Sequence, residues 1–140
     1  MDPGSGPYAV MPHTTDGSVW YTVGVFAGAA GFLRFDPATG LSEVYNVPQP
    51  GFGIRGGDID KNGVAWGSGS SGHLVSFDRR KCKGPLNGPK ATGKHCPEGW
   101  TLYPLPGPQF RGIEDGGSAE ATYYTWVDQF NTFGLGRNVP

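Results

Sequence analysis

The sequence lacks a long apolar run, a strong net charge and all but two cysteines. No stretch approaches the ~18–20 apolar residues of a membrane-spanning helix, so we expect no membrane span. The formal net charge is only −1, which gives no general reason to expect nucleic acid as a partner. The first ten residues, MDPGSGPYAV, also lack the basic and apolar regions of a secretory signal peptide.

Glycine and proline, in contrast, are abundant. The 25 glycines and 13 prolines form more than a quarter of the 140 residues. Such a content can indicate disorder, but 13% aromatic residues argue for a packed core. Frequent turn residues between aromatic and β-branched runs are typical of short strands. The composition therefore predicts an all-β protein with little or no helix.

The chain also repeats itself. TDGSVWYT (15–22) recurs as KNGVAWGS (61–68), which places the tryptophans Trp20 and Trp66 46 residues apart. A strand that ends in Phe-Asp follows in each copy, and then a strand that ends in proline. These segments are FLRFDPATG (32–40) with LVSFDRRKC (74–82), and LSEVYNVP (41–48) with WTLYPLP (100–106). A period of about 40–50 residues with several strands per unit is typical of β-propeller blades.

We therefore predict an incomplete β-propeller. Blade A covers about 8–48, blade B about 52–106 with a basic insertion at 79–98, and a partial blade C about 108–140. A closed ring usually needs four or more blades. We expect other propeller blades, or copies of the chain in a homo-oligomer, as partners.

DGSVWYT, GFLRFDPATG and GIRGGDIDKNGVAW resemble the repeats of the virginiamycin B lyase-like (streptogramin lyase-like) β-propellers. The resemblance covers about residues 8–106 and implies Mg²⁺-assisted elimination by a histidine and glutamates in the central channel. The repeat consensus commonly reads Trp-Phe-Thr-Glu. Here Val23 follows Trp20-Tyr21-Thr22, and Gly67 follows Trp66. The resemblance therefore favours the fold over the activity.

GGDIDKNGVAWG (56–67) resembles the first half of a Ca²⁺-binding loop, with Asp58, Asp60 and Asn62 as candidate ligands. Position 12 of such a loop carries a bidentate glutamate, but Gly69 stands there. A β-turn with side chains that accept backbone N–H groups is the favoured interpretation. Ca²⁺ or Mg²⁺ is the alternative.

Cys82 and Cys96 flank an insertion that the first repeat lacks. We predict a disulfide at the base of this hairpin loop, and hence a secreted or periplasmic protein. A metal site with His95 and His73 is the alternative. Six of the eleven Lys and Arg residues lie in the insertion: Arg79, Arg80, Lys81, Lys83, Lys90 and Lys94. They indicate a solvated loop, or a contact patch for an anionic ligand such as an acidic glycan.

Arg55 and Arg111 precede acids by three residues, Asp58 and Glu114. If both begin inner strands, they either form salt bridges between blades or line the channel mouth and bind carboxylates or phosphates. The aromatic residues of ATYYTWVDQF are predicted to be core, with sugar stacking as the alternative. They are Tyr123, Tyr124, Trp126 and Phe130.

No established catalytic motif occurs in the sequence. His73 and Glu114 are the weak catalytic candidates. We therefore expect an extracytoplasmic ligand-binding or scaffold module. The alternative is a lyase or hydrolase whose active site is completed by further blades or by another subunit.

Overall fold

A computed structural model describes residues 6–24, 30–109, 111–112, 117–120 and 122–140. Eight strands form two antiparallel sheets of four strands each, in the order β1-β2-β3-β4 and β5-β6-β7-β8. The first sheet holds β1 (Val10–Pro12), β2 (Val19–Val23), β3 (Gly31–Asp36) and β4 (Leu41–Asn46). The second holds β5 (Ile54–Ile59), β6 (Val64–Gly69), β7 (His73–Asp78) and β8 (Trp100–Pro104). The all-β prediction is confirmed.

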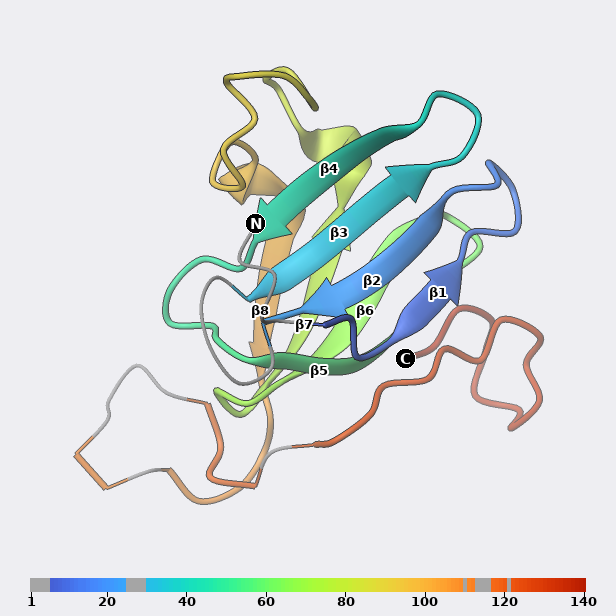
Figure 1. Cartoon of the computed structure of the whole chain (residues 1–140). Coiled ribbons are helices and arrows are strands. Elements are labelled where there is room, and N and C mark those ends of the chain that lie inside the picture. Colours follow the sequence, from blue (N-terminus) through green and yellow to red (C-terminus); the bar gives the residue numbers. More distant parts are fainter. Residues whose placement is uncertain (1–5, 25–29, 110, 113–116, 121) are drawn as a thin grey trace.

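The two sheets lie face to face, with the first sheet in front of the second in Figure 1. Strand β5 contacts both β1 and β2, so the strands at one edge of each sheet meet. Aromatic side chains of both sheets fill the space between them. The fully or almost fully buried ones include Trp20, Phe32, Tyr45 and Phe77, with Trp100 at 9% exposed. Burying each such ring contributes about 1.5–3 kcal/mol.

Glycines shape the turns between these strands. In FDPATG, the N–H of Gly40 donates to the carbonyl of Asp36 at 2.8 Å. Gly40 adopts a φ of +69°, which glycine reaches without strain. The hairpin expected between the strands at 32–36 and 41–47 is therefore present as β3 and β4.

The insertion lies against both sheets. It contains two short 3₁₀ turns, η1 (Arg79–Lys81) and η2 (Pro97–Gly99). The predicted Cys82–Cys96 disulfide is present, with Cα atoms 5.1 Å apart. The N–H of Asn46, at the end of β4, donates to the carbonyl of Gly93 at 2.7 Å. The loop of the second sheet is thus attached to the first.

The segment assigned to a partial blade C contains only isolated β-bridges in its described residues, Gln109 with Ser118 and Asp128 with Val139. The segment TYYTWV (122–127), which is rich in the β-branched and aromatic residues that strands prefer, joins neither sheet. It lies beside β5, where the N–H of Gly56 donates to the carbonyl of Tyr123 at 3.2 Å. In the described ranges, no helix is both long and apolar enough to cross a membrane.

Candidate ligand-binding site

Arg55 lies at an irregularity in β5. The pairing of β5 with β6 shifts register between Ile54 and Gly57. Such bulges re-aim side chains. The Nε–H of Arg55 donates to Oγ of Ser70 at 3.0 Å, and that hydroxyl donates to the carbonyl of Gly53 at 3.0 Å. The guanidinium is therefore fixed by the loop between β6 and β7.

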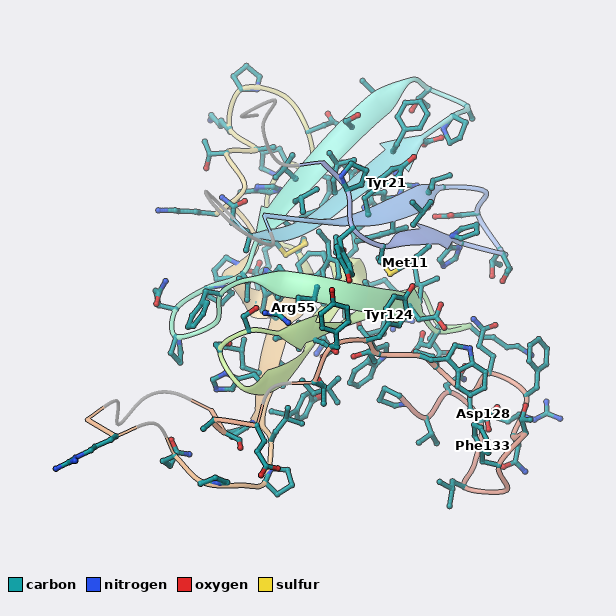
Figure 2. All side chains as sticks on the ribbon, turned by 60° about the horizontal axis from the view of Figure 1, so that its bottom comes forward. Met11, Tyr21, Arg55, Tyr124, Asp128 and Phe133 are labelled. Atoms are coloured by element: carbon teal, nitrogen blue, oxygen red, sulfur yellow. A yellow bond between two sulfur atoms is a disulfide. The ribbon has the colours of Figure 1, made fainter. Side chains whose placement is uncertain are left out.

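Three tyrosines lie near this guanidinium, and one of them contacts it. Its Cζ lies 5.1 Å from the ring centre of Tyr123, which is a cation–π contact. Tyr8 meets Tyr123 edge to face at 5.7 Å between ring centres. Tyr124 lies directly over Gly56, where a Cβ atom would overlap its ring. Figure 2 shows Arg55 and Tyr124 beside β5. Glycine at position 56 thus allows the C-terminal segment to approach the strand.

The tyrosines interact through their hydroxyl groups as well. A side-chain hydrogen bond with Tyr123 is the main cause that raises the pKa of Tyr8 above its ordinary value. Burial raises it further, while the charge of Arg55 acts in the opposite direction. Tyr123 and Tyr124 are 58% and 56% exposed. The site therefore consists of exposed, uncharged tyrosine side chains beside the positively charged Arg55.

Asp58, the predicted partner of Arg55, is engaged elsewhere. One carboxylate oxygen accepts the N–H of Ile59 at 2.8 Å and the other accepts the N–H of Val127 at 3.0 Å. No ion pair joins Arg55 to a carboxylate in the described part of the chain. Arg111 is exposed, and Glu114 lies outside the described residues. The salt bridge expected for Arg55 is thus not formed among these residues.

The Asp60 loop has the geometry of a turn. Its Oδ1 accepts the N–H groups of Asn62 and Val64 at 2.8 and 2.9 Å, and its Oδ2 accepts the indole N–H of Trp66 at 3.3 Å. Gly63 has a φ of +78°. Among the residues described, no three His, Cys, Asp or Glu side chains gather as ligands for a metal ion. The turn interpretation accounts for both oxygens of Asp60.

His73, a weak catalytic candidate, is only 3% exposed. Its Nδ1 lies 3.0 Å from Oγ of Ser71. Burial lowers the pKa of this imidazole, and a hydrogen bond with the backbone of Ser71 opposes the shift. The geometry fits a structural role between the strands better than a role at an accessible site.

A second polar cluster joins the sheets, and no motif or spacing in the sequence pointed to it. Glu43 of β4 is 3% exposed. Arg79 donates to it from Nε and one terminal nitrogen at 2.6 and 2.7 Å, and the hydroxyl of Tyr45 donates at 2.6 Å. Arg34 adds a contact at 3.4 Å. Burial alone would raise the pKa of Glu43, but these donors lower it below its ordinary value.

This cluster also changes the interpretation of the basic insertion. Arg79 binds Glu43 of the other sheet, and Arg80 pairs with Asp78 at 2.8 Å. Two of the six cations therefore form ion pairs with carboxylates of the chain itself. The other four are lysines that form no ion pair with a described residue: Lys81, Lys83, Lys90 and Lys94.

The core interpretation of the late aromatic residues is wrong. Trp126 is 50% exposed and Phe130 is 69% exposed. The N–H groups of Phe130, Thr132 and Phe133 converge on the buried carboxylate of Asp128, at 2.9–3.2 Å. Figure 2 shows Asp128 and Phe133 close together at the end of this segment. Asp128 thus organises a loop that presents its rings to solvent.

The arrangement defines the class of the protein: an all-β chain of two stacked, four-stranded antiparallel sheets with a repeated sequence. No protein-family model, no curated protein and no solved structure matches the chain.

Proposed function

We propose that the chain is a binding module built of β-propeller-like blades, and that Arg55 binds a carboxylate carried by a ring. One observation carries the proposal. The guanidinium of Arg55 is held by Ser70 and Tyr123, yet no described carboxylate neutralises it. Arg34, Arg79 and Arg80, in contrast, each pair with a carboxylate.

The chemistry of the site fits such a ligand. Only Nε of Arg55 forms a hydrogen bond within the described chain, which leaves its terminal nitrogens for two parallel bonds to a carboxylate. Paired bonds of this kind are strong and directional. The exposed tyrosine rings offer stacking surface for the ring of the ligand. Because the guanidinium is fixed beforehand, binding loses less side-chain entropy.

The propeller assignment rests on the repeat and on the equal pairing of its two copies. Val19 pairs with Phe35 in the first sheet, as Ala65 pairs with Phe77 in the second. The likeness to virginiamycin B lyase-like repeats supports the same architecture. The disulfide supports a secreted or periplasmic location. Lyase chemistry has less support, since His73 is buried.

Calorimetric titration with three small probes tests the site. Benzoate carries both a ring and a charge, acetate lacks the ring, and benzamide lacks the charge. We expect benzoate to bind most tightly of the three. Arg55→Gln should weaken it at least tenfold, because a hydrogen bond to a charged group contributes about 1.5–3 kcal/mol.

Arg55→Lys keeps the charge but loses the planar fork, so we expect it to recover only part of the affinity. Arg137→Gln is the matched control, since this arginine is exposed near the C-terminus. Equal binding of benzoate to the wild-type protein and to a folded Arg55→Gln variant would refute the proposal. Failure of benzoate to bind the wild-type protein would also refute it.

A further inference from the structure

The two sheets share one arrangement of paired aromatic residues. Phe35 and Phe77 occupy equivalent positions, opposite Val19 and Ala65. Tyr45 lies opposite Phe32 in the first sheet, as Tyr103 lies opposite Leu74 in the second. The tryptophans Trp20 and Trp66 occupy equivalent positions in β2 and β6. Each sheet therefore carries a Phe on one face and a Trp–Tyr pair on the other.

Between the sheets, the Trp–Tyr pair of the first sheet packs against the Phe of the second. Trp20 and Tyr45 of the first sheet stack at 6.1 Å with an interplanar angle of 16°. Phe77 of the second sheet packs on this pair, at 6.2 Å from Trp20 and 4.3 Å from Tyr45. All three side chains are 2% exposed or less. A Phe that covers a Trp–Tyr pair is thus the central contact between the sheets.

The other Trp–Tyr pair and the other Phe lie on the two outer faces of the molecule. Trp66 and Tyr103 stack at 5.9 Å with an interplanar angle of 22°, on the face of the second sheet that points away from the first. Tyr103 is 43% exposed. Phe35 lies on the opposite outer face, that of the first sheet, and is partly exposed. Its neighbours there are also apolar and partly exposed: Val19, Tyr21, Leu33 and Val44.

We propose that two copies of the chain associate head to tail, with the Phe35 face of one copy on the Trp66–Tyr103 pair of the next. The contact repeats the one that Phe77 makes with Trp20 and Tyr45 inside each copy. The faces that meet are different, so the association is heterologous and can continue to further copies, as a ring where the rotation closes and as a filament where it does not. This proposal does not depend on ligand binding at Arg55.

The C-terminal segment leaves room for this contact. Its residues lie over β5 and the end of β6, where Thr125 meets Ser68 at 2.8 Å between hydroxyl oxygens. Val127 binds Asp58 of β5 at 3.0 Å. Trp66 stays partly exposed and Tyr103 more so. We therefore expect the second copy to cover the part of the outer face that β6, β7 and β8 form.

Light scattering on a sizing column tests the proposal. We expect the wild-type protein to show a concentration-dependent mass above that of one chain. Phe35→Lys and Tyr103→Lys should each elute as a single chain, because each destroys one of the two faces. A mixture of these two variants should form a dimer and nothing larger, since one intact pair of faces remains.

Val44→Lys and Thr101→Lys, on the same two faces, form a second pair if the first variants fold poorly. Phe52→Ser is the control, because Phe52 is 53% exposed in the connection between the sheets. A wild-type protein that stays a single chain up to millimolar concentration would overturn the proposal. So would a mixture of folded variants that stays monomeric, because one intact pair of unlike faces then fails to associate. A single folded variant that still dimerises on its own would also overturn it, because that result indicates that like faces meet.

Discussion

The buried carboxylate of Glu43 gives a quantitative prediction for Arg79→Ala. Arg79 belongs to the insertion of the second sheet, and Glu43 belongs to β4 of the first, so the substitution removes a tie between the sheets. Breaking a fully buried pair costs about 3–5 kcal/mol. The Arg79 side chain is 31% exposed, and Arg34 and Tyr45 stay bound to the carboxylate. We therefore expect a loss of about 2 kcal/mol, or roughly 6 °C in melting temperature.

Arg80→Ala is the matched control. Arg80 is the neighbouring residue and also pairs with a carboxylate, but its side chain is 64% exposed. Exposed pairs contribute about 0–1 kcal/mol. Urea unfolding followed by tryptophan fluorescence measures both variants under the same conditions. Equal stability of the two variants at neutral pH would refute our account of Glu43.

The pH dependence gives an independent check. The pKa of Glu43 in the folded state lies below the ordinary value of 4.5. The stability that its ionised form contributes is therefore complete above about pH 4.5 and decreases as the pH falls through the folded pKa. The difference between the wild-type protein and Arg79→Ala should shrink over the same range. A difference that stays constant down to pH 3 would contradict the assigned cause.

Two further predictions concern the insertion and the Asp60 turn. Replacing both Cys82 and Cys96 with serine should lower stability by about 3 kcal/mol in thermal unfolding, because the disulfide closes a loop with a sequence separation of 14; an unchanged melting temperature would show that the loop is held by its other contacts. Asp60→Ala should cost about 1–2 kcal/mol, since three N–H groups lose their acceptor. Added Ca²⁺ should leave the wild-type melting temperature unchanged, and a rise would identify a metal loop after all.

Much of the fold could be predicted because the same local sequence pattern occurs in both copies of the repeat. The turn at Gly40, the strands that end in Phe-Asp and the disulfide all follow from residues close in sequence. The segment 122–127 has an equally strong strand composition. It nevertheless joins neither sheet, because pairing depends on a neighbouring edge that composition does not report.

The candidate site was predictable only in part. Arg55 stood out through its echo at Arg111, but its contacts with Ser70 and Tyr123 depend on chain segments distant in sequence. Glu43 gave no signal, because a glutamate in an alternating strand usually points to solvent. Its burial follows from the placement of Arg79, which only the folded insertion determines.

The bulge at Arg55 and Gly56 shows where the second copy of the repeat departs from the first. The pairing of β1 with β2 runs in continuous register over Val10–Pro12, whereas the equivalent pairing of β5 with β6 is interrupted. One additional residue thus turns an arginine out of the ladder while the aromatic packing of the repeat is preserved. Substitution of Arg55 itself should therefore change the proposed binding site with little cost to the stacked core, whereas its neighbours Ile54 and Gly56 are buried. For protein engineering, Arg55 is thus a position at which the proposed specificity can be tested separately from stability.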